Sequence, residues 1–168
     1  MSCQLKLVQP AEREHFRQIA EAYWRELMPH ADVLQSAEQR ERYFQEEFTW
    51  AGGNQHPHWG SVDGHLIGFV AFSVDQERKT AYIDDFYILP EARRQGNGTA
   101  LLQALYRHFD EIGVECVELS VRRDNPRGLA FWEAQGFRIG SYRMRQYRDP
   151  KTGQAFIGAL SSDFTEGR

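Results

Sequence analysis

The spacing of hydrophobic and polar positions changes several times along this chain, and each change predicts a different element. In the first third, apolar residues recur every three or four positions, which is the spacing of one helix face. One such stretch contains Phe16, Ile19, Ala20, Tyr23, Trp24 and Leu27, and a second runs from about residue 34 to residue 48 with Tyr43, Phe44 and Phe48. We therefore expect two amphipathic helices, preceded by a short strand at residues 3–8.

The rest of the chain mixes the shorter period of strands with further helical stretches. Glycine and proline interrupt the pattern at residues 51–60, and residues 65–74 follow the turn VDG as the second strand of a hairpin. The expected elements after it are a strand at 80–89, a helix at 98–112, a strand at 116–121, a helix at 126–135, and strand segments at 137–140 and 142–148. This alternation predicts an α/β fold.

The stretch ILPEARRQGNGTALL, residues 88–102, joins an expected strand to an expected helix and is rich in arginine and glycine. The first N–H groups of a helix have no partner within it and carry partial positive charge, so they bind anions where the backbone comes close. Gly96 and Gly98 permit that approach, and the guanidinium groups of Arg93 and Arg94 suit phosphate oxygens. The stretch therefore predicts a diphosphate site.

Three phosphate-binding motifs compete for this stretch, and two of them fit poorly. A Walker loop requires a lysine directly after its second glycine, and none follows Gly98. A dinucleotide-binding turn requires a third glycine or alanine where this chain has Leu101. The third pattern, R-x-x-G-x-G at a strand-to-helix turn, is matched at every position from Arg93 to Gly98.

On this third pattern the chain resembles the GNAT superfamily of acyl-CoA-dependent N-acetyltransferases. YILPEARRQGNGTALL is similar to the family's coenzyme A loop, and DNPRGLAFWEAQGF is similar to its next helix and the turn after it. The resemblance implies an α/β fold with a mixed, centrally splayed β-sheet flanked by helices, and acetyl-CoA as co-substrate. The run from Ile83 to Ile88 also resembles a stretch of the polyamine (spermidine/spermine) acetyltransferases.

The resemblance also implies which residues meet the coenzyme. Backbone amides of the loop hold the pyrophosphate, while the backbone of Tyr87 and Ile88 and the side chain of Asn125 meet the pantetheine arm. Asn125 is in addition a good helix N-cap before Pro126, and capping alone would explain it. The expected coenzyme-binding residues are Tyr87, Ile88, Arg93, Arg94, Gln95, Gly96, Asn97, Gly98, Thr99, Asn125 and Trp132.

One position departs from the family pattern. Many members have a tyrosine that protonates the departing sulfur where this chain has Trp132, and an indole N–H is too weak an acid for that role. Packing against the sheet is the ordinary explanation for Trp132. Tyr142 is our candidate for the missing hydroxyl, ahead of Tyr87 and Tyr106.

Two acids, Asp84 and Asp85, interrupt an otherwise apolar strand. Strict alternation places them on opposite faces of the sheet. A carboxylate in such a position is costly unless it is paired, hydrogen-bonded or hydrated. A salt bridge to an arginine such as Arg122, or a bulge that turns one acid to solvent, would meet this cost. The functional alternative is that Asp84 acts as general base and Asp85 attracts a cationic amine.

Composition narrows the partners and the compartment. The length of 168 residues suits one domain covering residues 1–168, and the formal net charge of −4 argues against a nucleic-acid binder. No apolar run approaches the roughly 18 to 20 residues of a membrane span. Cys3 and Cys116 form no metal or redox motif, which favours a reducing, cytoplasmic setting, and we expect Cys116 to be buried. No metal site is expected, because His56 and His58 lack a third ligand.

These features predict an enzyme that moves an acetyl group from acetyl-CoA to the primary amine of a small cationic molecule, by direct attack in a ternary complex. A protein or peptide acceptor and a non-catalytic acyl-CoA sensor are the alternatives. Glu26, Glu46 and Glu47 are candidates for negative potential at the acceptor site, although a solvated helix face is their more ordinary explanation. A homodimer is compatible with the resemblance, because the family often dimerises.

Overall fold

A five-stranded sheet forms the centre of the computed structural model, which describes residues 2–28, 36–48, 56–142, 147–148 and 155–156. Its strands lie in the order β1 (Cys3–Leu7), β2 (His56–Val62), β3 (His65–Asp75), β4 (Thr80–Ile88) and β5 (Cys116–Leu119). Neighbouring strands are antiparallel except β4 and β5, which are parallel. The short strands β6 (Tyr147–Arg148) and β7 (Ala155–Phe156) form a separate pair.

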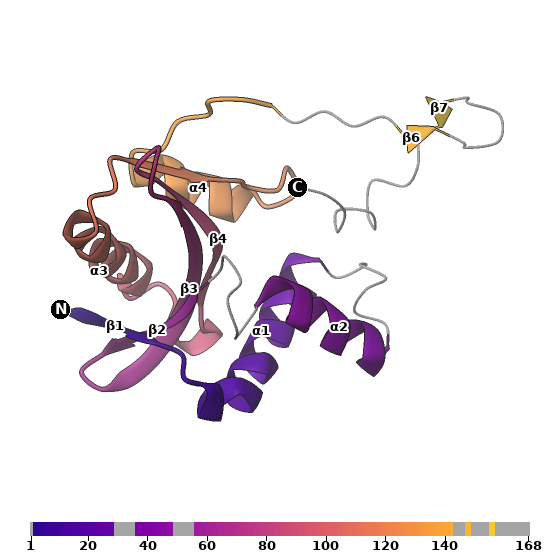
Figure 1. Cartoon of the computed structure of the whole chain (residues 1–168), viewed down its shortest axis with the longest axis horizontal. Helices are drawn as coiled ribbons and strands as arrows, with labels where there is room; N and C mark the ends of the chain where they lie inside the picture. The colour runs from indigo at the N-terminus through magenta and orange to yellow at the C-terminus, as the bar shows by residue number, and fades with distance from the viewer. Residues whose placement is uncertain (1, 29–35, 49–55, 143–146, 149–154, 157–168) are drawn as a thin grey trace.

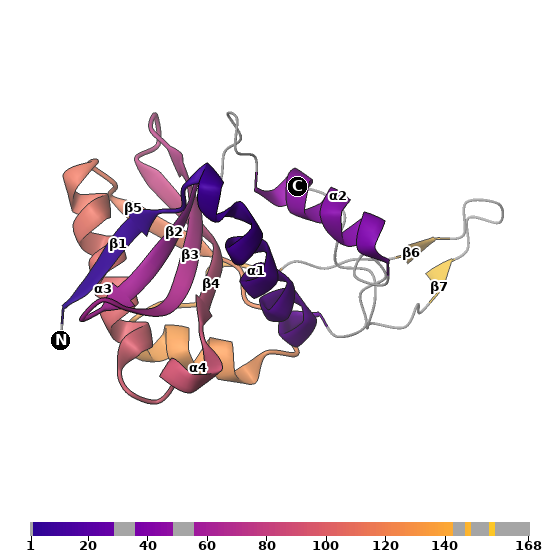
Figure 2. The ribbon, with the colours of Figure 1, turned by 90° about the horizontal axis from the view of Figure 1, so that it is seen from below.

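Helices cover both faces of this sheet. Figures 1 and 2 show α1 (Arg13–Leu27) and α2 (Ala37–Glu47) on one face, and α3 (Asn97–Glu111) and α4 (Pro126–Ala134) on the other. Two short 3-10 helices, Pro10–Glu12 and Pro90–Ala92, precede α1 and the loop before α3. The structure is thus the mixed α/β arrangement that the sequence predicts.

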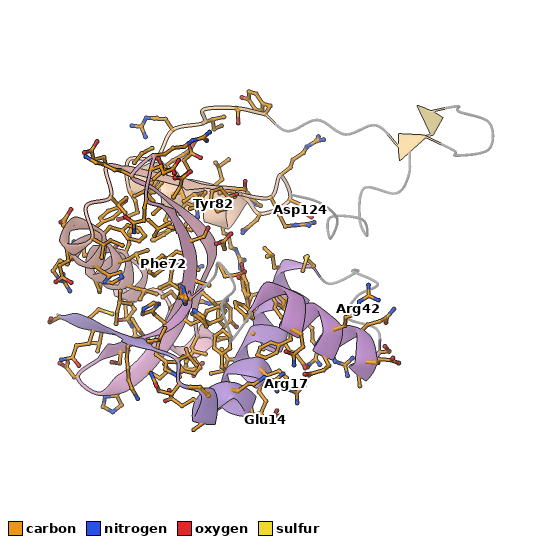
Figure 3. All side chains as sticks on the ribbon, viewed as in Figure 1. Glu14, Arg17, Arg42, Phe72, Tyr82 and Asp124 are labelled. Carbon is orange, nitrogen blue, oxygen red and sulfur yellow. The ribbon has the colours of Figure 1, made fainter. Side chains whose placement is uncertain are left out.

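Each face of the sheet has its own apolar cluster. Phe72, Leu101 and Leu105 belong to the cluster under α3 and α4, and Figure 3 shows Phe72 on the α3 side of the sheet. Phe16 and Trp24 belong to the cluster under α1 and α2. The predicted stripe of α1 is confirmed, because its members are buried or partly buried in that second cluster.

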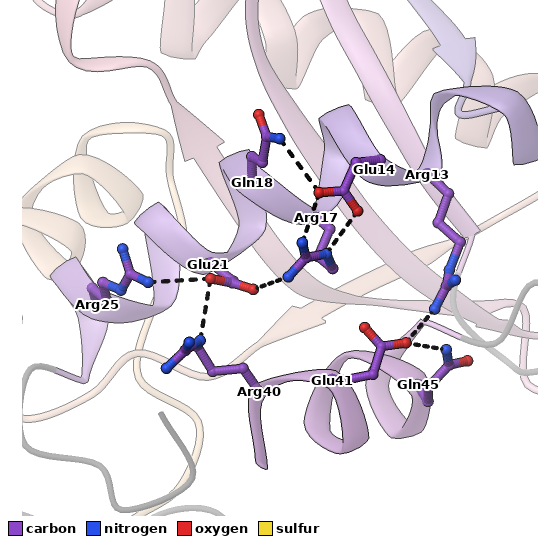
Figure 4. Close-up of polar contacts among 9 residues, drawn as sticks. All are labelled: Arg13, Glu14, Arg17, Gln18, Glu21, Arg25, Arg40, Glu41 and Gln45. Carbon is purple, nitrogen blue, oxygen red and sulfur yellow. Dashed lines mark hydrogen bonds and ion pairs between the residues drawn. The ribbon is translucent and has the colours of Figure 1, made fainter. Parts of the chain in front are cut away.

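Ion pairs join α2 to the polar side of α1 (Figure 4). Arg13 of α1 contacts Glu41 of α2 at 2.6 Å, and Arg40 of α2 contacts Glu21 of α1 at 3.4 Å. Glu21 is 8% exposed, and Arg17 also contacts it, at 2.5 Å. Because these arginines compensate the buried carboxylate, α2 is oriented on α1 by charge as well as by apolar packing.

A bulge in β4 changes the faces that alternation predicts. Phe72 lies opposite Ile83 and Ala71 lies opposite Asp85, so Asp84 is an extra residue in β4. An extra residue shifts the phase of the side chains that follow it. Ile83 and the later Phe86 therefore pack in the same cluster under α3 and α4, and the expectation of one unbroken alternation was wrong.

The sheet opens at the same point. The β4–β5 pairs run from Thr80 with Cys116 to Ile83 with Leu119. From Asp84 onward, β4 has no β5 partner among the described residues. The expectation of a centrally splayed sheet is confirmed.

Three further expectations need correction. β2 begins at His56, inside the stretch expected to be irregular, because proline is tolerated near the start of a strand, where Pro57 lies. Residues 137–140 were expected to be a strand and have no regular structure; Phe137 packs on Trp132, 5.1 Å between ring centroids, instead of joining the sheet. Cys116 is exposed because it begins β5 at an edge of the described sheet. Residues 143–146 lie outside the described residues, as do the side chains of Glu46 and Glu47.

Candidate active site

The loop between β4 and α3 presents a row of unbonded N–H groups. In the described part of the chain, no backbone N–H from Arg94 to Thr99 donates a hydrogen bond to another residue, whereas Ala100 N–H donates to Gly96 O at 3.0 Å. Left-handed backbone at Arg94 (φ 60°) and Gly96 (φ 79°) turns the chain into the helix. The loop thus combines free N–H groups with a helix amino end, the arrangement that binds phosphate.

Side chains of the loop stabilise it through hydrogen bonds to other residues. Asn97, which is 5% exposed, donates from Nδ2 to Ala92 O at 2.8 Å, and Gln95 donates from Nε2 to Glu91 O at 2.9 Å. Thr99 Oγ1 accepts from Gln135 Nε2 at 3.3 Å, which ties α3 to the end of α4. These contacts occupy the side chains and leave the backbone N–H groups available to a ligand.

The two arginines of the loop differ in their surroundings. Arg93 donates from Nε to Ile88 O at 2.8 Å, and its two terminal nitrogens contact Glu26 at 2.8 and 2.7 Å. Hydrogen bonds from Arg93 lower the pKa of Glu26. Arg94 is exposed and has no ion pair within the described residues. In this conformation Arg94, and not Arg93, is the cation available at the rim of the loop.

Gly98 lies where α3 packs against α4. A Cβ atom at this position would lie 3.1 Å from Phe131 Cε2 and 3.9 Å from Ile88 Cγ1. The side-chain direction of Gly98 therefore points toward Phe131 of α4. At Gly96 a Cβ atom would meet nothing within 4 Å, so the positive φ alone favours glycine there.

The free edge of β4 offers main-chain groups beside this loop. Leu89 N–H donates to Ile67 O at 2.9 Å, and Tyr87 O faces Gly68 of β3. Because main-chain groups of successive residues point to opposite edges of a strand, those of Phe86 and Ile88 face the open side. Phe86 therefore replaces Tyr87 as the expected main-chain partner of an extended ligand, and Arg93 already occupies the carbonyl of Ile88.

The two acids lie where the sheet opens. Asp84, half-buried, is the bulged residue directly after the last β4–β5 pair. Asp85 is 9% exposed and lies opposite Ala71, a member of the cluster under α1 and α2. Arg122 donates two hydrogen bonds to the carboxylate of Asp124, from Nε to Oδ1 at 2.9 Å and from Nη2 to Oδ2 at 2.7 Å. The bulge considered for the acids is present, and Asp85 lies on the α1 face of the sheet.

A model of the acetyltransferase (GNAT) family matches residues 15–137, which includes the loop, the opening and α4. The chain belongs to the GNAT acetyltransferase family. An uncharacterized N-acetyltransferase of Archaeoglobus fulgidus is 33% identical over 82 residues, 46% of this chain and 56% of that protein. L-2,4-diaminobutyric acid acetyltransferase of Nocardia farcinica is 31% identical over 86 residues, 51% of this chain and 45% of that enzyme.

The alignments differ in extent. The chain spans about half the length of these two relatives. The ribosomal protein bS18 alanine N-acetyltransferase of Escherichia coli is 26% identical over 133 residues, 79% of this chain and 77% of that enzyme.

Solved structures share the fold. The Bacillus subtilis protein YycN matches with a TM-score of 0.71 over 87% of this chain and 98% of its own, at 17% identity. The PaiA N-acetyltransferase of Thermoplasma acidophilum, in complex with coenzyme A, matches with a TM-score of 0.64 over 85% of this chain and 94% of its own, at 21% identity.

Asn125, directly before α4, and Trp132, within it, are the residues that the GNAT resemblance singles out, and both have clear structural roles. Asn125 caps the helix, because its Oδ1 accepts from Gly128 N at 2.9 Å, so the predicted cap is confirmed. Trp132 is 9% exposed and packs edge-on against Phe86 and Phe131, 5.0 Å between ring centroids in each case. Contact of either residue with coenzyme A stays a prediction.

The tyrosines considered as proton donors differ in their position relative to the point where β4 and β5 separate. Tyr142, our candidate for the missing hydroxyl, is 83% exposed in a segment without regular structure, so the geometry does not bring it into the opening. The ring of Tyr87 lies beneath the Arg93 guanidinium group, and burial raises the pKa of Tyr87. Tyr82, which was not among the candidates, donates from its hydroxyl to Ser120 Oγ at 2.5 Å, beside the end of the β4–β5 pairing. Tyr82 precedes Ile83, which forms the last β4–β5 pair. Hydrophobic periodicity does not show where this pairing ends, so it could not single out Tyr82.

Among the described residues, no group of three or more His, Cys, Asp or Glu is arranged to hold a metal ion. None of the described helices is both long and apolar enough to pass through a membrane. A cytoplasmic location and a homodimer stay predictions.

Proposed function

We propose that this chain transfers an acetyl group from acetyl-CoA to the primary amine of a small cationic molecule. The observation that carries the proposal is the combination found along β4. The strand separates from β5 at Asp84, and four residues further, at Ile88, it leads into the loop of free N–H groups. At a rise of about 3.3 Å per residue, roughly 13 Å of strand edge joins the two ends.

The residues of the chain suit a thioester donor lying along this edge. Free N–H groups from Arg94 to Thr99 would hold the diphosphate, with the Arg94 side chain adding charge at the rim. Main-chain groups of Phe86 and the N–H of Ile88 would orient the arm by strand-like hydrogen bonds. When bound, acetyl-CoA supplies the thioester carbonyl carbon that the amine attacks.

The two acids would complete the chemistry. Asp85 faces α1 and would attract an ammonium group, while Asp84, at the opening, would accept the proton that the amine loses. The new N–C bond forms as the C–S bond breaks, and the sulfur leaves with the bonding electrons. Two carboxylates side by side favour a cationic acceptor over a neutral or anionic one.

A thiol-release assay tests this proposal. Purified chain and acetyl-CoA are mixed with polyamines, aminoglycosides, amino acids or peptides, and free thiol is followed with a chromogenic disulfide. We expect amine-dependent release, with the highest kcat/KM for a small amine of two or more positive charges. Binding of coenzyme A by calorimetry without release for any amine would instead identify a sensor, and no binding at all would refute both functions.

A second candidate is acetylation of a protein amino terminus. It is favoured by the Escherichia coli alanine N-acetyltransferase, because that alignment extends over 79% of the chain, further than those of the other two relatives. A synthetic peptide beginning with alanine, compared with the same peptide blocked at its amino terminus, discriminates the two. A kcat/KM for the free peptide above that of every small amine would replace the small-molecule assignment.

A further inference from the structure

One ion pair joins the end of α1 to the loop between β4 and α3. Arg93, at the start of the loop, and Glu26, in the last turn of α1, are 67 residues apart in the sequence. Both terminal nitrogens of Arg93 contact the two carboxylate oxygens of Glu26, at 2.8 and 2.7 Å. A two-point contact of this kind fixes the direction of both side chains, and not only their separation.

The same guanidinium group has two further contacts. Its Nε donates to Ile88 O at 2.8 Å, and its central carbon lies 5.3 Å from the centre of the Tyr87 ring. Arg93 therefore connects the start of the loop to the end of α1 and to the open edge of β4. Each contact restricts where the following residues, Arg94 to Thr99, can lie.

This arrangement uses Arg93 as a support and not as a phosphate ligand. The guanidinium group is already matched by a carboxylate, and its Nε is occupied by a main-chain carbonyl. We propose that Glu26 is a positioning residue for coenzyme A binding, which acts through Arg93 by holding the loop in its binding conformation. The inference rests on the proposed function, because it assigns the loop to coenzyme A.

The sign of one substitution separates this role from simple electrostatics. Coenzyme A is polyanionic, so removing a nearby carboxylate should strengthen its binding if only charge mattered. Removing a support should weaken binding, because the loop then spends less time in the competent conformation. Glu26→Gln keeps the shape of the side chain and removes its charge, and the two accounts give opposite results.

Calorimetry with coenzyme A is the direct measurement. We expect Glu26→Gln to raise Kd about tenfold, as it would if the binding conformation of the loop became about ten times less populated. The Glu26 and Arg93 side chains are 51% and 34% exposed, and exposed ion pairs contribute little to stability, so the melting temperature should hardly change. Glu41→Gln is the matched control, because it removes the same charge from the Arg13–Glu41 pair between α1 and α2. Its Kd should stay within twofold of that of the unmodified chain.

A double-mutant cycle tests whether Glu26 acts through Arg93. Arg93→Gln alone should also weaken binding, and adding Glu26→Gln to it should change Kd less than twofold. Additive effects, or unchanged or tighter binding by Glu26→Gln, would overturn the inference while the unmodified chain still binds coenzyme A. An unmodified chain that binds no coenzyme A would overturn the proposed function and this inference together.

Discussion

Replacing Gly98 by valine tests whether this glycine serves packing or direct phosphate contact. Its Cβ would lie 3.1 Å from Phe131 Cε2, whereas carbon atoms prefer about 3.5 to 4.0 Å, so even one methyl group requires a shift of about half an ångström. Alanine would partly offset this cost through its better helix propensity, about 1 kcal/mol over glycine. Valine adds two more methyl groups, and overpacking of this kind costs about 1 to 3 kcal/mol. Gly98→Ala should therefore be nearly neutral and Gly98→Val clearly destabilising.

Thermal unfolding and coenzyme A calorimetry on the same preparations provide the measurement. For a chain of this length, about 1 to 3 kcal/mol corresponds to a fall in Tm of roughly 2 to 12 °C. The double variant Gly98→Val/Phe131→Leu should recover part of that loss, because the smaller side chain makes room. A Gly98→Val protein with normal Tm and at least tenfold weaker coenzyme A binding would refute the packing account and favour a phosphate at that position.

Three further predictions address the acids, the tryptophan and a half-buried histidine. Asp84→Asn should mainly lower kcat, whereas Asp85→Asn should mainly raise KM for cationic amines; normal kinetics for both variants would make the carboxylates structural. Trp132→Phe should keep kcat within about tenfold, roughly 1.4 kcal/mol of barrier, and a thousandfold loss in a folded variant that binds acetyl-CoA would contradict this. Burial lowers the pKa of His58 below its usual 6.5, so the folded chain binds this proton less readily than the unfolded chain. The stability contribution is therefore complete above pH 6.5 and is lost as pH falls below it. The urea midpoint should be lower at about pH 5 than at about pH 7.5. His58→Phe should reduce the difference and His65→Phe should not.

Hydrophobic period and turn residues were sufficient to predict the helices and the loop between β4 and α3. The apolar stripe of α1 is buried where its spacing predicts, and α3 begins at Asn97, one residue before the expected start at Gly98. Helix ends are local features, set by glycine, caps and the first apolar turn, so a single sequence contains the information.

The bulge and the Glu26–Arg93 pair are not local in this sense. A one-residue insertion in β4 leaves the alternating letters unchanged, and only the pairing with β3 shows that Asp84 is the extra residue. Likewise, the R-x-x-G-x-G pattern identifies Arg93 but not its partner, which comes from α1 and depends on how that helix lies across the sheet. Sequence reasoning therefore identified Arg93 without its partner and assumed one unbroken alternation along β4.

In the proposed reaction, the departing sulfur can take a proton from a nearby side chain. Trp132 is enclosed by aromatic rings and has no acidic proton to give, and the exposed Tyr142 follows a helix without entering the sheet. Tyr82 differs from both, because its hydroxyl and that of Ser120 bridge β4 and β5 where the strands begin to separate. A thiol of pKa about 8.5 also leaves tolerably as thiolate beside main-chain donors, so a proton donor is a moderate aid and not a requirement. We infer that the hydroxyl missing from α4 is better sought at Tyr82 than at Tyr142, because a proton donor must lie where the C–S bond breaks, and that point is set by the opening of the sheet.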